Sequence, residues 1–267
     1  MLGDVVGQSG CRALFAGLAG LVKRTRANIV IANAENAAGG YGLTSEIVDR
    51  LLGIGVDAIT TGNHVWQNPE IRATLDTGIP LLRPENYPEG VPGRGHCIVQ
   101  TRQGMSVGVL NLEGRVHLSD LYCPFRVGAR VARRLRKHTD VIIVDFHAEW
   151  TEEKEALAWY LDGTVSVLVG THTHVQTADE RILPKGTGYI TDIGMTGPTD
   201  GVIGMNRHEA VRRALTQMPL KLDLETGPAS IMGVVVEIST EQGKTLALER
   251  VHEQSIVKES GEEGISS

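Results

Sequence analysis

Short runs of aliphatic and β-branched residues alternate along the chain with segments whose apolar residues recur every three or four positions. The first pattern is typical of strands and the second of amphipathic helices. Strands are predicted at residues 28–32, 58–60, 97–101, 106–112, 141–146, 165–169, 188–193, 232–238 and 245–251. Helices are predicted at residues 12–26, 45–52, 69–75, 125–137, 152–161 and 208–217. This alternation indicates an α/β fold.

Turn signals refine the prediction. Residues 101–104 and the pair Gln242–Gly243 each separate two strand runs, which predicts two hairpins and therefore mixed rather than all-parallel sheets. Asn68 before Pro69 predicts the start of a helix. Only Met1 and Leu2 precede Gly3-Asp4, fewer than the ~5 residues of an ordinary buried strand. The first strand is thus expected to be a stub, or to begin N-terminal to this chain.

Composition is that of a globular protein. The 267 residues include 41% hydrophobic and 22% charged side chains, which predicts a single domain over residues 1–255. Residues 256–267 are expected to form a flexible C-terminal tail. The net charge of −6 and the lack of an obvious basic stripe argue against a duplex nucleic acid as partner. The arginine-rich segment 126–137 is interpreted as an amphipathic helix with a solvated charged face.

Cysteine usage and hydropathy bear on location. Cys11, Cys97 and Cys123 are odd in number and form no CxxC pair, so neither a disulfide framework nor a thiolate zinc site is expected. No apolar run is long enough to cross a bilayer, and no signal-peptide pattern is visible. We therefore expect a cytoplasmic protein without a membrane partner.

Polar residues able to bind metal ions recur directly after the predicted strands. They stand at five separate strand ends: Asp4, Glu35 with Asn36, Asn63 with His64, His147, and His172 with His174. In α/β sheets the loops at the carboxyl ends of the strands converge on one crevice, where ligands gather. Five strands that each deliver such a residue therefore predict one shared site.

The residue types favour transition metals. Three imidazoles, two carboxylates and two carboxamides, without a thiolate, suit iron, manganese, zinc or nickel better than magnesium or calcium. Seven ligands are too many for one tetrahedral ion but fit two ions that share a carboxylate. On an extended segment alternate side chains share a face, so both imidazoles of His172-Thr173-His174 are expected to point into one pocket.

Each motif taken alone has a structural explanation. Asp4 after a glycine is typical of a turn, and residues 35–40 are typical of a flexible loop. His147 alone is compatible with a core histidine. Residues 3–10 lack the lysine of a phosphate-binding P-loop, and no complete dinucleotide-binding glycine fingerprint is present. It is the joint occurrence of the motifs, in this order, that indicates a metal site.

That order resembles the calcineurin-like metallophosphoesterases. Residues 62–64 (Gly-Asn-His) and 170–174 (Gly-Thr-His-Thr-His) match motifs of that superfamily. Two motifs depart from it, because Val6 stands where a histidine is expected and Glu35-Asn36 replaces Gly-Asp. With residues 34–40, 145–149 and 191–198, these departures resemble the YmdB-like branch over nearly the whole chain, from residue 3 to about residue 251.

The resemblance implies a four-layer α/β/β/α sandwich with two mixed sheets and a dinuclear centre. Glu35 matches the bridging carboxylate of that centre. Asp4 and His174 match ligands of the first ion, and Asn36 is inferred to replace the histidine missing at Val6. The ligands of the second ion correspond to Asn63, His147 and His172. Iron or manganese is expected, with zinc or nickel as alternatives.

The resemblance also implies hydrolysis of phosphodiesters, especially 2′,3′-cyclic nucleotides, by a metal-bridging hydroxide. His64 is the expected proton donor, although it could instead orient Asn63. Trp66, Tyr87 and Trp150 flank motif loops, where they could line a substrate pocket or serve as packing groups. The alternatives are a phosphomonoesterase with the same two metals and a non-catalytic nucleotide- or RNA-binding regulator. A homo-oligomer is compatible with the resemblance, but no apolar stripe marks an interface.

Overall fold

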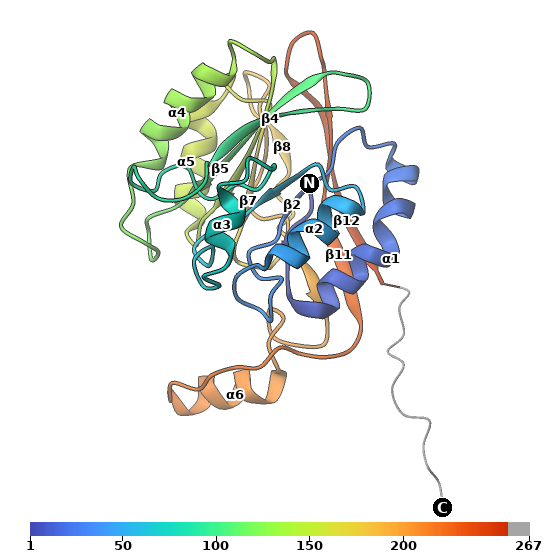
Figure 1. Cartoon of the computed structure of the whole chain (residues 1–267), viewed down its shortest axis with the longest axis vertical. Helices are drawn as coiled ribbons and strands as arrows, with labels where there is room; N and C mark the ends of the chain where they lie inside the picture. Colours follow the sequence, from blue (N-terminus) through green and yellow to red (C-terminus); the bar gives the residue numbers. More distant parts are fainter. Residues whose placement is uncertain (256–267) are drawn as a thin grey trace, which may run out of the picture.

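The computed structural model describes residues 1–255, and the predicted tail at residues 256–267 lies outside the described residues. Helices and strands alternate along the chain, and the strands form several sheets, as predicted for a mixed α/β fold (Figure 1). Among the described residues, no helix combines the length and apolar character needed to cross a membrane.

The larger sheet has six strands in the order β4-β5-β6-β7-β9-β8. They are β4 (His96–Gln100), β5 (Ser106–Glu113), β6 (Val141–His147), β7 (Val167–Thr171), β8 (Arg181–Ile182) and β9 (Gly188–Ile190). β5, β6, β7 and β9 run parallel, whereas the edge strands β4 and β8 are antiparallel to their neighbours. The predicted hairpin at residues 101–104 joins β4 to β5, and the carboxyl ends of the parallel strands share one edge.

The other strands form a second group. These are β1 (Asp4–Val5), β2 (Ile31–Asn33), β3 (Ala58–Thr60), β10 (Met195–Pro198), β11 (Ala229–Ile238) and β12 (Thr245–Gln254). Four of them pair in the order β1-β10-β11-β12, and β2 pairs with β3. Leu2 bridges both Ala32 and Gly233, so it connects β2 to β11. In this chain β1 spans two residues, and Gln242–Gly243 lies in the second predicted hairpin.

Helices cover the two groups of strands from opposite sides (Figure 1). They are α1 (Gly7–Thr25), α2 (Ser45–Gly53), α3 (Ile71–Leu75), α4 (Pro124–Leu135), α5 (Thr151–Leu161) and α6 (Arg207–Thr216). α1 packs on β10 and β11, whereas α4 packs on β5 and on α5. α6 projects away from the rest of the protein (Figure 1).

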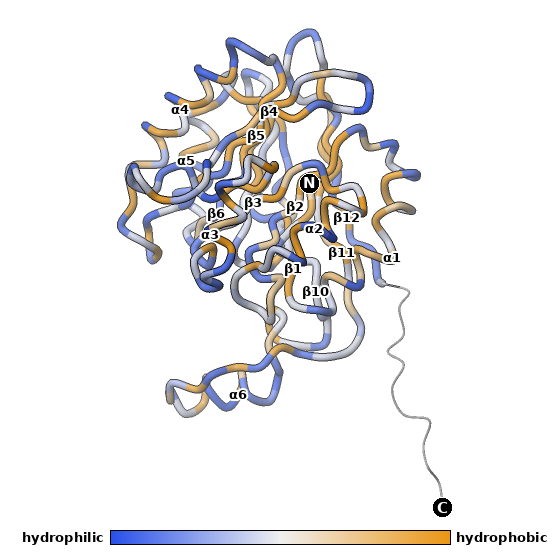
Figure 2. The backbone as a smooth tube through the Cα atoms, in the orientation of Figure 1, coloured by the Kyte–Doolittle hydropathy of each residue, from blue (hydrophilic) through white to orange (hydrophobic). Residues whose placement is uncertain are grey.

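Apolar side chains gather in three main clusters. One lies among α1, α2 and β2, and a second lies between the six-stranded sheet and helices α4 and α5. The third joins Val109, Ile143 and Val169 of the six-stranded sheet to Ile31 and Val234 of the other strands. The sheet strands are accordingly rich in apolar positions, while polar positions concentrate on the outer loops and helix faces (Figure 2). Burial of apolar surface is the main stabilising term for such an arrangement.

The element boundaries differ from the predicted ones in places where tertiary contacts decide them. α1 begins at Gly7 rather than residue 12, because Gly7 adopts φ +59° and turns the chain directly from β1 into the helix. The prediction for Asn68 and Pro69 was wrong, since α3 begins only at Ile71. Asn68 instead caps a turn by accepting a hydrogen bond from the Glu70 amide at 3.3 Å.

A buried ion pair ties α5 to the loop after β9. Lys154 Nζ lies 2.9 Å from Asp192 Oδ2, and both side chains are fully buried. The same carboxylate oxygen accepts hydrogen bonds from the Thr173 amide and hydroxyl. Asp192 therefore anchors the segment that carries the two histidines of the 170–174 motif.

We predict that Lys154→Met lowers the free energy of unfolding by about 3–5 kcal/mol, because it leaves the Asp192 charge buried and unpaired. Urea unfolding measures this loss. The matched control is Glu155→Gln, which breaks the partly exposed Arg181–Glu155 pair and costs at most about 1 kcal/mol. Equal losses in the two variants would contradict this account of the buried pair.

Candidate metal centre

The structure brings every predicted site residue to one cluster at the strand ends. Asp4 lies in the stub strand β1, and His147 is the last residue of β6. The others stand in loops directly after β2, β3 and β7: Glu35, Asn36, Asn63, His64, His172 and His174. The arrangement of the strands thus brings together residues that are far apart in sequence, such as Asp4 and His174.

His147 is at the centre of one half of the cluster. Its Nε2 lies 2.9 Å from Glu35 Oε1, 2.9 Å from Asn63 Oδ1 and 3.0 Å from His172 Nδ1. Glu35, His147 and His172 each offer a ligand atom, and these atoms all lie within 4.8 Å of one another. Four potential ligand atoms from four separate strand ends therefore come close together, as a metal site requires.

The other half of the cluster joins His174, Asn36 and Asp4. His174 Nε2 lies 3.2 Å from Asn36 Nδ2 and 3.9 Å from Asp4 Oδ1. Asp4 Oδ1 is buried and has no hydrogen-bond partner, although buried carboxylate oxygens are normally satisfied. A cation held between Asp4 and His174 would satisfy this oxygen, so the residues fit a metal ion in this half as well.

The pKa values of the cluster's side chains reflect burial and the close approach of carboxylates and imidazoles. Burial raises the pKa of Asp4. Burial also opposes ionisation of Glu35, but His147 and His64 outweigh it and hold the Glu35 pKa well below its usual value. For His147, burial is again the largest effect, yet the nearby carboxylates raise its pKa to about 9. Burial and the neighbouring His147 lower the pKa of His172 to about 3.

The segment that carries His172 and His174 is bent, not extended as predicted. β7 ends at Thr171, and the backbone φ angles of His172 and His174 are +104° and +65°. Such conformations cost roughly 1–3 kcal/mol in residues with a side chain, and they persist where surrounding contacts impose them. Asp4 Oδ2 accepts the His172 amide at 3.1 Å, and the Ile203 carbonyl lies 3.0 Å from His174 Nδ1. These contacts turn both imidazoles into the cluster.

A buried polar network beneath the cluster was not predicted from the sequence. Asp145 accepts hydrogen bonds from Thr60, from Thr171 at 2.7 Å and from Asn33 at 3.1 Å. Because the Thr171 hydroxyl donates to Asp145, it accepts from His147 Nδ1, which lies 3.0 Å away. This bond leaves His147 Nε2 free to face the cluster as a ligand. The signal was present, since Asp145 interrupts an otherwise apolar run.

His64 lies beside Glu35 and Asn36 and is accessible from outside. Its amide donates to Glu35 Oε2 at 3.0 Å, and its Nδ1 lies 2.7 Å from Asn36 Oδ1. A carboxamide oxygen only accepts, so Nδ1 carries the proton of this bond and Nε2 is left for another partner. The side chain is 23% exposed, and Tyr41 packs edge-on against the ring at 5.0 Å.

The three flanking aromatic residues have different environments. Trp66 and Tyr87 pack edge to face with ring centroids 5.5 Å apart, and Trp66 packs against the core beside α1. Tyr87 also lines a cavity, whereas Trp150 is 45% exposed. Both Trp66 and Tyr87 therefore pack against the core, and Tyr87 also contributes to the wall of the cavity.

Gly62 provides a direct test of the His147 position. A Cβ atom on Gly62 would lie 2.1 Å from His147 Cδ2, so Gly62→Ala must displace the imidazole. We predict that this variant stays folded by circular dichroism but loses at least about half of its bound metal in elemental analysis after reconstitution, because ligand geometry sets metal affinity. Gly53→Ala is the control, because its Cβ would meet nothing within 4 Å. Full metal occupancy in Gly62→Ala would contradict the assignment of His147.

Comparison with known proteins identifies a family that matches this chain. The family model described as YmdB-like protein matches residues 1–251. The chain is 45% identical over 250 residues to the 2′,3′-cyclic-nucleotide 2′-phosphodiesterase of Bacillus subtilis (strain 168), covering 94% of both chains.

Solved structures agree with this match. The crystal structure of a hypothetical protein from Thermus thermophilus aligns with a TM-score of 0.86 at 39% identity, covering 95% of this chain and 98% of that one. A novel phosphatase from Mycoplasma pneumoniae aligns with a TM-score of 0.88 at 34% identity, covering 95% and 92%. The chain therefore belongs to the YmdB-like protein family.

Proposed function

We propose that this protein is a metal-dependent phosphodiesterase that hydrolyses 2′,3′-cyclic nucleotides at the cluster around Glu35. The observation that carries this proposal is the convergence of Glu35, His147 and His172, with ligand atoms within 4.8 Å of one another. The substrate class is supported by the 45% identical relative, which is named for that activity. A pair of transition-metal ions, when bound, would activate water and offset the charge that develops on the phosphoryl oxygens.

The geometry supports a shared role for Glu35. Its Oε1 lies 2.9 Å from His147 Nε2 and 3.4 Å from Asn36 Nδ2, so it touches both halves of the cluster. We assign Asp4, Asn36 and His174 to one ion and Asn63, His147 and His172 to the other. Asn36 would bind through its carboxamide oxygen, which is the ligand atom that an amide offers.

We assign His64 as the proton donor. In the proposed reaction a water molecule that has lost one proton to solvent forms a bond to phosphorus through its oxygen, the P–O2′ bond breaks, and its electron pair leaves on O2′. His64 acts in its imidazolium form: the hydrogen bond between Nδ1 and Asn36 fixes the ring, and Nε2 donates its proton to O2′. Without that proton the leaving group would be an alkoxide, which is a poor one at neutral pH.

Several finer assignments belong to the same proposal. The separate clusters beside α1 and beside α4 and α5 support the α/β/β/α layering and a single domain over residues 1–255. The mixed nitrogen and oxygen ligands support iron or manganese. The unpaired state of the three cysteines is compatible with a cytoplasmic location. Homo-oligomerisation stays a prediction.

We predict that His64→Ala lowers kcat for 2′,3′-cyclic AMP by about 10²–10⁴-fold while both metal ions remain bound. Steady-state kinetics and elemental analysis of the same sample measure the two effects. His138→Ala is the control, because His138 is exposed and precedes the start of β6, whereas His147 is the last residue of that strand. Unchanged turnover in His64→Ala would remove the proton-donor role.

Parallel assays distinguish the proposed diesterase from a phosphomonoesterase. We predict that kcat/KM for bis(p-nitrophenyl) phosphate exceeds that for p-nitrophenyl phosphate by at least about 10-fold. A doubly charged monoester must be accommodated beside the buried Asp4 and Glu35, whereas a diester carries one charge less. A preference for the monoester would favour the phosphomonoesterase, and tight binding of a cyclic nucleotide without turnover would favour a binding protein.

A further inference from the structure

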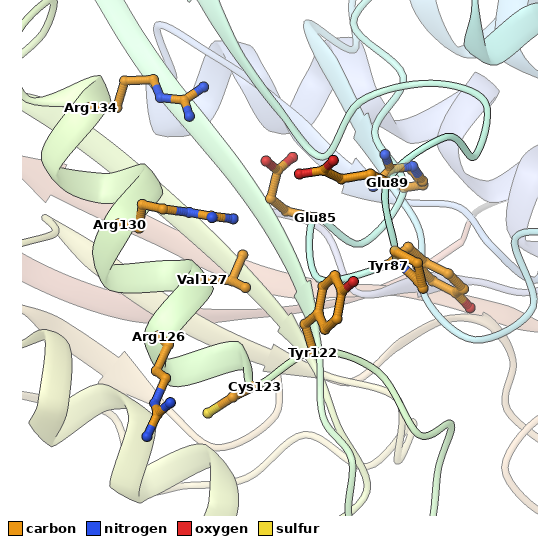
Figure 3. Close-up of a pocket in the computed structure, with 11 residues that line it drawn as sticks. Glu85, Tyr87, Glu89, Tyr122, Cys123, Arg126, Val127, Arg130 and Arg134 are labelled. Atoms are coloured by element: carbon orange, nitrogen blue, oxygen red, sulfur yellow. The ribbon is translucent and has the colours of Figure 1, made fainter.

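A cavity of about 610 Å³ lies between α4 and the loop that contains Glu85 and Tyr87. Arg126, Arg130 and Arg134 of α4 line one wall of it. They recur every four residues, so they form one stripe along the helix with a rise of about 6 Å between successive members. Figure 3 shows Arg130 and Arg134 reaching from α4 toward the opposite wall.

These three arginines have no ion-pair partner among the described residues, although all are exposed on a protein of net charge −6. By contrast, Arg136 at the end of α4 is engaged, because its Nε bonds the Thr164 carbonyl at 2.9 Å. A row of unpaired guanidinium groups on one cavity wall provides charge complementarity for successive phosphate groups.

The rest of the cavity is lined by carboxylate and aromatic side chains. Glu85 and Glu89 face the arginine stripe, and the ring of Tyr122 lies between α4 and Tyr87 (Figure 3). Glu85 is fixed by hydrogen bonds with the Gly95 amide at 2.9 Å and His96 at 3.1 Å. A nucleotide offers a phosphate to arginines, a base that stacks on tyrosine, and amino or hydroxyl donors to carboxylates. A simple inorganic anion would be repelled by the two carboxylates.

Packed neighbours link the cavity to the metal cluster, although no side chain of the cluster lines the cavity. Tyr87 lines the cavity and packs on Trp66, which follows His64 by two residues. The Asn86 side chain donates to the carbonyl oxygens of Glu113, at the end of β5, and of Tyr122. α4 begins just after this point, so Arg126 is the member of the stripe nearest to the cluster and Arg134 the farthest. The stripe therefore leads away from the proposed reaction site.

We infer that this groove holds the upstream nucleotides of a single-stranded RNA whose 3′ end carries the 2′,3′-cyclic phosphate hydrolysed at the metal cluster. The inference rests on the proposed function and extends its substrate from mononucleotides to oligoribonucleotides. A 2′,3′-cyclic phosphate forms on the terminal ribose of a strand, so the rest of the strand must leave the site through its 5′ oxygen. The arginine stripe bonds its phosphates, and Tyr122 stacks on a base.

The test measures binding and hydrolysis separately. A hexaribonucleotide with a 5′ fluorescent label and a 3′-phosphate, which is not hydrolysed, reports binding by anisotropy at several salt concentrations. The same hexamer with a 2′,3′-cyclic phosphate and 2′,3′-cyclic AMP report hydrolysis. The variant replaces Arg126, Arg130 and Arg134 by glutamine, and the control is Arg133→Gln, an exposed arginine of α4 that does not line the cavity.

We expect the triple variant to bind the hexamer at least about 10-fold more weakly. The slope of log Kd against log salt concentration should decrease by roughly 2 in this variant. Its kcat/KM should fall for the cyclic hexamer and stay unchanged for 2′,3′-cyclic AMP, and Arg133→Gln should match the wild type in every assay.

Three results would overturn the inference: equal binding by the triple variant and the wild type, an equal loss in Arg133→Gln, or competition by hexaglutamate as effective as that by the hexanucleotide. Hexamer binding that depends on the three arginines, without hydrolysis of either cyclic substrate, would support the groove and overturn the proposed function instead.

Discussion

Two buried carboxylates, Asp4 and Glu35, place negative charge where strands from separate sheets meet. Removing such groups from water costs several kcal/mol each unless positive charge compensates them. In this chain the compensation comes from imidazoles, as the raised pKa of His147, about 9, indicates. A bound cation would supply that charge more directly and would also satisfy the buried Asp4 Oδ1. The assignment of a metal site follows from this need to compensate the two buried carboxylates.

The need to compensate buried charge also explains the polar groups beneath the cluster. Asp145 joins Thr60, Thr171 and Asn33 across three strands, and Thr171 in turn orients His147. Asp192, paired with Lys154, holds the bent segment after β7. Neither acid belongs to the proposed ligand set: Asp145 acts on His147 through Thr171, and Asp192 bonds Thr173, which lies between His172 and His174. A buried network of this kind stabilises the fold only when every member has a hydrogen-bond partner. Here the residues of the neighbouring strands provide those partners.

Much of the site could be predicted from sequence because ligand-type residues follow apolar strand runs, and parallel strands share one edge. What sequence could not provide was local geometry imposed by distant partners. The positive φ angles of His172 and His174 depend on Asp4 and on the Ile203 carbonyl. The short strand β10 exists only because β1 and β11 flank it. The arginine stripe of α4 fits the predicted amphipathic pattern, but the pattern does not reveal the cavity in front of it.

Anomalous diffraction from crystals reconstituted with manganese or iron tests the central claim most directly. The account predicts two peaks about 3.5–4 Å apart. One peak should lie within bonding distance of Asp4 and His174, the other of His147 and His172, and both of Glu35. A single peak away from Glu35, or none in fully reconstituted crystals, would contradict it.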